Sequence, residues 1–119
     1  MKNLNIGKDF SPDPSGRFRS DGNSSGEAFR EDCFKKVIEN LEDEDVLNII
    51  LDDDVEGYGS SFLVEGFAGM VKYGYITGEE LLKKIKFSYN DEDFGFYKDK
   101  IIDYINQATF NSKEYLRNS

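Results

Sequence analysis

The sequence predicts a single α/β domain, residues 1–119, in which a mixed β-sheet is covered mainly on one face by three or four helices. Two observations support this fold class. Short segments of alternating or β-branched apolar residues, typical of strands, are separated by longer segments with apolar residues every three or four positions, typical of helices. In addition, 119 residues with 38% hydrophobic content can bury one core. Because helices separate the strands, at least part of the sheet should be parallel.

The first half of the chain predicts two strands with one helix between them. Apolar and polar residues alternate weakly in residues 1–10, which favours a strand at the edge of the sheet. Residues 11–25 are rich in Gly, Pro, Ser and Asp and predict a long loop. Residues 25–41 form an amphipathic helical stripe. The apolar, β-branched run "VLNIIL", residues 46–51, predicts a buried strand.

The second half predicts two helices, a strand and a last helix. Helical spacing of apolar residues begins near Ser60 and ends near Tyr73, and residues 77–84 form a short helix capped by Thr77. Residues 85–89 alternate as a third strand, and residues 93–108 form an amphipathic helix. Residues 109–119 are polar and predict a flexible tail. Three residues of this tail could instead dock onto the domain or bind a partner: Phe110, Tyr115 and Leu116.

The organising unit of the chain is the central strand, an acidic glycine-rich turn and the helix that follows it. In open α/β sheets, ligands and partners gather at such strand-to-helix turns. The turn therefore supplies a candidate phosphoacceptor or partner-contact site, formed by Tyr58, Gly59, Ser60 and Ser61. The alternative interpretation is that the two serines only cap the helix, since a serine oxygen can accept from an unpaired amide of the first turn.

Two segments carry a family resemblance that covers about half the chain. "DVLNIILDDDVEGYGSSFLVEGFAGM" and "SGRFRSDGNSSGEAFRED" (residues 15–32) resemble the STAS-like family of uncharacterised bacterial and phage-type domains. The resemblance implies a small STAS-like layer of sheet and helices and a regulatory context, with no established activity. In the related anti-sigma factor antagonists, a serine at the equivalent turn is phosphorylated by a partner kinase. The similar position here is Ser60 or Ser61, and the implied partner is a GHKL-type ATPase.

The loop before the first helix is a candidate anion-binding segment. Backbone amides at a helix N-terminus, together with glycines and arginines, can hold a phosphate or carboxylate. The spacing matches neither a Walker loop nor a dinucleotide fingerprint. Two other interpretations remain open: the loop is structured and Arg30 pairs with a local acid, or the loop docks against the acidic turn at Asp52–Asp54. The candidate residues are Arg17, Arg19, Gly22, Ser25, Gly26 and Arg30.

The acidic turn also invites comparison with a calcium site. Asp52, Asp54 and Glu56 occupy positions 1, 3 and 5 of an EF-hand loop, but position 12, where a bidentate Glu is needed, would be Leu63. A strand precedes the turn, whereas an EF-hand requires a helix. We therefore expect no metal site, with a looser Mg²⁺ or Ca²⁺ site on these three carboxylates as the alternative.

Composition narrows the function classes further. The chain has no His and one Cys, which excludes His-based catalysis, the usual zinc sites and an intrachain disulfide. It shows no recognisable nucleophile–base pair, so we expect neither an enzyme nor a cofactor. A net charge of −9 opposes direct binding to nucleic acid. No apolar run approaches the roughly 20 residues that span a bilayer, and the N-terminus lacks a signal peptide, so we expect a cytoplasmic protein.

Three functional hypotheses follow. The first is a regulatory, non-enzymatic protein-binding module that switches partners through the Asp52–Ser61 turn and the helix after it. The second is a small acidic inhibitor, phage-encoded in one version, that occupies the basic groove of a nucleic-acid-binding enzyme; it requires the carboxylates to form one continuous face. The third is a nucleotide binder that uses the Ser11–Gly26 loop. We favour the first.

Overall fold

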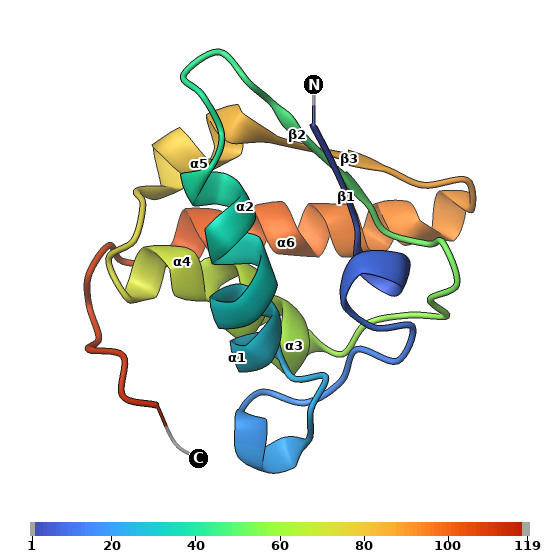
Figure 1. The fold of residues 1–119 in the computed structure, drawn as a ribbon, viewed down its shortest axis with the longest axis horizontal. Helices are drawn as coiled ribbons and strands as arrows, with labels where there is room; N and C mark the ends of the chain where they lie inside the picture. The colour runs from blue at the N-terminus through green and yellow to red at the C-terminus, as the bar shows by residue number, and fades with distance from the viewer. Residues whose placement is uncertain (1, 118–119) are drawn as a thin grey trace.

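The computed structural model describes residues 2–117 and shows a three-stranded sheet packed against helices (Figure 1). The strands are β1 (Lys2–Asn5), β2 (Leu47–Ile50) and β3 (Ile85–Ser88), in the spatial order β1-β2-β3. Both strand pairs are parallel, because a helical crossover separates each strand from the next. The predicted α/β fold is confirmed, and the described sheet is parallel throughout where a mixed sheet was predicted.

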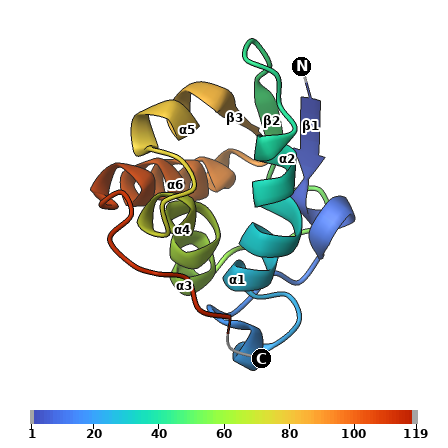
Figure 2. The ribbon, with the colours of Figure 1, turned by 60° about the vertical axis from the view of Figure 1, so that its left-hand side comes forward.

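The two faces of the sheet differ in character. Side chains alternate between the faces along a strand, and one face carries buried apolar residues: Leu4, Leu47, Ile49 and Ile85. On the opposite face Asn48 donates to Asn3 (3.1 Å) and accepts from Ser88 (2.7 Å). Figure 2 shows the strands at one side of the molecule and helices α3 to α6 on the other. The helices therefore cover one main face, as predicted.

The first strand is shorter than predicted. It ends at Asn5, and residues Ile6–Phe10 form a π-helical turn in place of further strand. The Asn5 side chain accepts a hydrogen bond from the Lys8 amide and so caps this turn. Gly7 lies against the turn after β2, where a Cβ would come within 1.9 Å of the Asp53 carbonyl oxygen. This close approach requires glycine, and sequence alternation alone did not indicate it.

The first helical run joins β1 to β2. It consists of α1 (Gly26–Phe29), a π-helical turn (Arg30–Phe34) and α2 (Lys35–Glu39). Ser25 caps α1, because its hydroxyl accepts from the Ala28 amide at 3.1 Å. The apolar stripe of this helical run is buried as the sequence predicted: Phe29, Phe34 and Ile38.

The second helical run follows β2 and packs against the first. It consists of α3 (Ser60–Leu63), a π-helical turn (Val64–Ala68) and α4 (Gly69–Lys72). A Cβ on Gly26 would lie 2.7 Å from the Phe62 carbonyl oxygen, so glycine permits the two runs to touch through their backbones. Four buried aromatic rings fill the rest of this contact: Phe29, Phe34, Phe62 and Phe67.

The last two helices frame the third strand. Helix α5 (Gly78–Lys84) begins after Thr77, whose hydroxyl accepts from the Glu80 amide as predicted, and leads directly into β3. Helix α6 (Gly95–Gln107) then runs back beneath β3 (Figure 1). None of the helices within residues 2–117 has both the length and the apolar character needed to cross a bilayer.

The C-terminal segment, for which the sequence predicts a flexible tail, makes backbone hydrogen bonds to α4. The Asn111 amide donates to the Val71 carbonyl (2.9 Å), and the Lys113 amide donates to the Lys72 carbonyl (3.0 Å). The Tyr115 ring packs edge-on against Tyr73, with ring centres 5.5 Å apart. The docking of Tyr115 that the sequence left open is therefore observed. Residues 118 and 119 lie outside the described chain.

Candidate functional site

The acidic turn after β2 is held by its own carboxylates. Asp52 accepts hydrogen bonds from the backbone amides of Asn90 (2.7 Å) and Asp91 (2.8 Å), in the turn that follows β3. Asp53 accepts from the Asn5 side chain at the end of β1 (2.7 Å). These bonds join the chain at the carboxyl ends of all three strands, the edge where parallel sheets bring functional groups together.

The structure does not gather the carboxylates considered as metal ligands. Asp54 and Glu56 are exposed, whereas Asp52 is turned toward the amides of the neighbouring turn. Within residues 2–117, no three side chains of His, Cys, Asp or Glu are close enough to share a metal ion. Asp52 thus stabilises the turn, whereas Asp54 and Glu56 lie at its surface, and the structure shows no coordination geometry for the three carboxylates.

The two serines of the turn are not helix caps. Gly59, which has no side chain, is the N-cap of α3, with backbone angles of −80° and 152°. Ser60 is exposed and Ser61 is half-buried in the first helical turn. The capping interpretation of these serines is therefore wrong. Their hydroxyls stand at the N-terminal end of a helical run, where the aligned peptide dipoles favour negative charge.

Tyr58 differs from its predicted role as a contact residue. It is 8% exposed, and its hydroxyl donates to the Leu51 carbonyl oxygen at 2.6 Å. Burial, followed by the nearby charge of Asp52, raises the pKa of Tyr58. This tyrosine consequently anchors the turn to the end of β2.

A groove lies beside Ser60, between α3 and the start of α6. It has a volume of about 240 Å³. Phe96 stands at its rim with 61% of its surface exposed, and the Lys100 ammonium lies 5.5 Å from the centre of that ring. The groove therefore combines an exposed hydroxyl, an exposed aromatic ring and a cation. Its lining residues are Tyr58, Ser60, Leu63, Tyr97, Lys100 and Tyr104, with Phe96.

The predicted anion-binding loop binds carboxylates of its own chain. The Arg19 guanidinium makes two hydrogen bonds to Asp32, each 2.8 Å, and these bonds lower the pKa of Asp32. The backbone amides of Arg17 and Phe18 both donate to Asp21 at 3.0 Å, which lowers the pKa of Asp21. The loop is thus structured and closed on acids of its own region, and none of these bonds reaches the Asp52–Asp54 turn.

The remaining residues of that candidate set have structural positions. Gly22 is exposed at the tip of the loop with φ of 148°, a backbone region that favours glycine. Ser25 is a buried helix cap, and Gly26 lies in the backbone contact between the two helical runs. Arg17 is exposed, so only this arginine of the set projects into solvent.

Arg30 pairs with a local acid, Glu31, as one interpretation of the sequence had it, and it also lies at the centre of a buried ionic cluster that the sequence did not predict. It is fully buried and forms ion pairs with Glu31 (2.8 Å) and Glu65 (2.7 Å). Its guanidinium carbon lies 4.4 Å from the ring centre of Tyr73 and 5.0 Å from that of Tyr115. Burial lowers the pKa of Arg30, but the hydrogen bonds to the two carboxylates outweigh it and raise the pKa overall.

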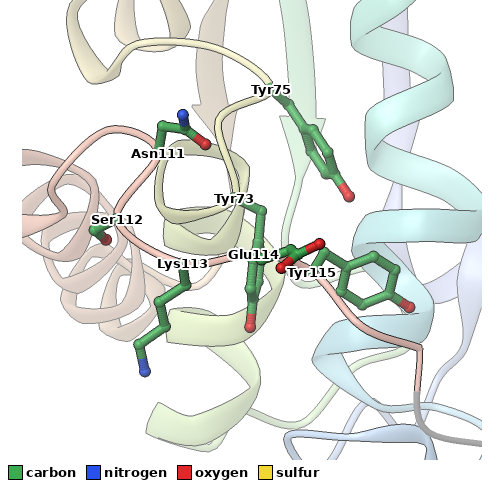
Figure 3. A pocket seen from close by; sticks show the side chains of 7 residues that line it. All are labelled: Tyr73, Tyr75, Asn111, Ser112, Lys113, Glu114 and Tyr115. Atoms are coloured by element: carbon green, nitrogen blue, oxygen red, sulfur yellow. The ribbon is translucent and has the colours of Figure 1, made fainter.

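Three tyrosines close this cluster on the side of the C-terminal segment. Their hydroxyls donate to acids of the cluster: Tyr73 to the buried Glu65, Tyr75 to the half-buried Glu31 and Tyr115 to the buried Glu27. Figure 3 shows the three rings together with the C-terminal segment around a shallow cavity of about 450 Å³. The one feature of the sequence that indicates this cluster is a charged residue within a run of apolar and small residues, namely Glu65 in "FLVEGFAGM".

Comparison with known proteins adds no relative. No family model, no curated protein and no solved structure matches the chain.

Proposed function

We propose that the chain is a non-enzymatic regulatory module that binds a protein partner through the Asp52–Ser61 turn and the adjoining groove. The contact region, which we name the Ser60 surface, consists of Ser60, Phe96, Lys100 and the groove between them. The observation that carries the proposal is the exposed Ser60, which does not cap its helix, beside an exposed aromatic ring. Exposed aromatic residues next to a pocket are typical anchors of protein interfaces.

Phosphorylation of Ser60 would act as the switch. It would add about −1.5 to −2 charges at the end of a helical run whose dipole favours an anion. Lys100, which lines the same groove, supplies a cation. The expected result is a changed surface on an unchanged fold. The partner implied by the STAS-like resemblance is a GHKL-type ATPase, and we place the interaction in the cytoplasm.

The acidic-inhibitor hypothesis receives less support from the geometry. It needs carboxylates that are free to enter a basic groove. Four of them are instead engaged by the chain's own arginines: Glu27, Glu31, Asp32 and Glu65. Other acids are divided between turns, as at Asp52–Asp54, and separate helices, as at Glu79 in α5 and Asp103 in α6. We therefore retain this hypothesis only as an outcome of the test below.

The test is an affinity pull-down from the lysate of the native host with four baits. The baits are the wild type, Ser60→Asp, Phe96→Ala and the control Ser20→Asp, which places the same charge on an exposed serine of the distant loop. We expect a GHKL-type ATPase or its regulatory target with the wild type and the control. Its recovery should fall with both of the other variants. Incubation of the recovered ATPase with the chain and ATP should then phosphorylate Ser60.

Two results would contradict the proposal. Equal recovery by all four baits would show that the Ser60 surface is not the contact. Recovery of a nucleic-acid enzyme by every bait would favour the acidic-inhibitor hypothesis. Circular dichroism of each bait separates loss of binding from loss of fold.

A further inference from the structure

A second groove lies on the other flank of α6, between this helix and β3. It has a volume of about 350 Å³. Lys98 and Ile102, one helical turn apart on α6, form one wall, whereas Phe96 and Lys100 face the Ser60 surface. The buried line of α6, at Ile101, separates the two grooves. We name this second site the β3 groove; its lining residues are Leu82, Ile85, Lys86, Phe87, Lys98 and Ile102.

One wall of the β3 groove is the edge of the sheet. Strand β3 has β2 on one side only, since the order of the sheet is β1-β2-β3. The Ser88 carbonyl points toward the β2 side, because it accepts from the Leu51 amide at 3.0 Å. Backbone groups of successive strand residues point to opposite sides, so the N–H and C=O of Phe87 face the free edge. Such an edge is a template on which another strand can form hydrogen bonds.

The charge at the groove is opposite to that of the whole chain. Lys86 is exposed on the polar face of the sheet, and Lys98 stands on α6 at the other side of the groove. Lys83 is already paired with Glu79 and Glu80, but Lys86 and Lys98 form no ion pair with any residue of 2–117. Although the net charge is −9, distant carboxylates are screened beyond about 8 Å at physiological salt. An acidic partner is therefore favoured locally.

We propose that the β3 groove binds an extended acidic peptide, which adds to β3 as a further strand. Its backbone pairs with that of Phe87. Because strand side chains alternate, every second residue enters the groove and meets Ile102, which requires apolar residues there. The intervening residues lie on the open face beside Lys86, which favours Asp or Glu. The partner is thus a segment that alternates apolar and acidic residues, a specificity separate from that of the Ser60 surface.

The test uses a short fluorescein-labelled peptide of alternating valine and aspartate with the full chain. We expect saturable binding in fluorescence anisotropy. In an ¹⁵N-labelled sample, amide shifts should concentrate in residues 85–88 and at Ile102. The double variant Lys86→Glu, Lys98→Glu should weaken binding roughly fivefold or more, because it removes two exposed attractive charges and replaces them with repulsive ones. Ile102→Asp should also weaken peptide binding, although both lysines remain in place.

Matched controls separate strand addition from general charge attraction. Lys36→Glu changes the net charge at an exposed site on α2 and should leave the affinity unchanged. Phe96→Ala, which alters the Ser60 surface, should also leave the affinity for the peptide unchanged. Failure of the β3-groove proposal is therefore distinguishable from failure of the proposed function. A peptide N-methylated on alternate amides that pair with β3 should lose binding.

Three results would overturn the proposal. One is the absence of saturable binding to the wild type. The second is binding that the double lysine variant or N-methylation leaves unchanged. The third is self-association of the chain through β3, seen by analytical ultracentrifugation and abolished by Ile102→Asp, which would identify a second copy as the occupant.

Discussion

Arg30 and Glu65 form a buried ion pair that connects the two helical runs of the fold. Nη1 of Arg30 lies 2.7 Å from both the side-chain carboxylate and the backbone carbonyl oxygen of Glu65. Arg30 is fully buried and Glu65 is 7% exposed. The desolvation of the two charges opposes folding, and their mutual attraction offsets this cost only while both side chains are present. This property makes the pair sensitive to single substitutions.

Removing one member of the pair should destabilise the fold strongly. We expect Arg30→Met to lower the free energy of unfolding by about 3–5 kcal/mol, because it leaves the buried Glu65 carboxylate without its cation. The double variant Arg30→Met, Glu65→Leu should recover much of this loss, since no unpaired charge remains at that contact. Urea unfolding measures all three proteins. The control Arg17→Ala, at an exposed arginine, should change stability by less than about 0.5 kcal/mol. Equal losses for the single and double variants would contradict the prediction.

The backbone contact at Gly26 gives a second prediction. A Cβ there would lie 2.7 Å from the Phe62 carbonyl oxygen and 2.9 Å from the Gly66 amide nitrogen. Gly26→Ala should therefore push the helical runs apart and cost roughly 1–3 kcal/mol, as overpacking does. Gly59→Ser is the matched control: a Cβ there meets nothing within 4 Å, and a serine at this N-cap can cap α3. Thermal unfolding should show a loss for the first variant and no loss for the second.

Periodicity predicted most of the fold because burial follows a local pattern. The apolar runs of β2 and β3 and the stripe of Phe29, Phe34 and Ile38 lie where their spacing placed them. The end of β1 was not predictable in this way, since it depends on the contact of Gly7 with Asp53, which is distant in sequence. Parallel pairing throughout also depends on which strands meet, and a local pattern does not determine this.

The candidate sites were less predictable, because charged residues are placed by their partners. Arg19 and Arg30 resembled anion ligands in the sequence, yet their carboxylate partners lie up to 35 residues away, as Glu65 does from Arg30. The Ser60 surface was indicated by its turn alone. Its second half, Phe96 and Lys100, comes from α6 and is visible only in three dimensions.

The docked C-terminal segment should contribute to stability mainly through Tyr115. Tyr115→Phe removes the hydroxyl that donates to the buried Glu27 carboxylate, so we expect a loss of about 1–3 kcal/mol in the free energy of unfolding. Tyr115→Ala should lose more, because it also removes the ring that packs against Arg30 and Tyr73. Leu116→Ala is the control, since Leu116 is 69% exposed. Equal stability of Tyr115→Ala and the wild type in urea would show that this segment does not stabilise the fold.

The tyrosines that close the Arg30 cluster should make the protein sensitive to alkali. Burial, followed by the hydrogen bond that its hydroxyl donates to Glu65, raises the pKa of Tyr73 to about 12, from an ordinary value of about 10. Burial likewise raises the pKa of Tyr75, whose hydroxyl donates to Glu31.

The sign of this effect follows from the order of ionisation. The unfolded chain loses the Tyr73 proton first, so the stabilisation from neutral Tyr73 is complete below about pH 10 and is lost progressively between about pH 10 and about pH 12. We expect the urea midpoint to fall as pH rises through this range. In Tyr73→Phe the midpoint should be lower at neutral pH but should fall less steeply, because the group that ionises is absent. Lysine deprotonation affects both proteins alike and cancels in the comparison. Parallel declines in the two proteins would show that Tyr73 ionisation is not linked to folding.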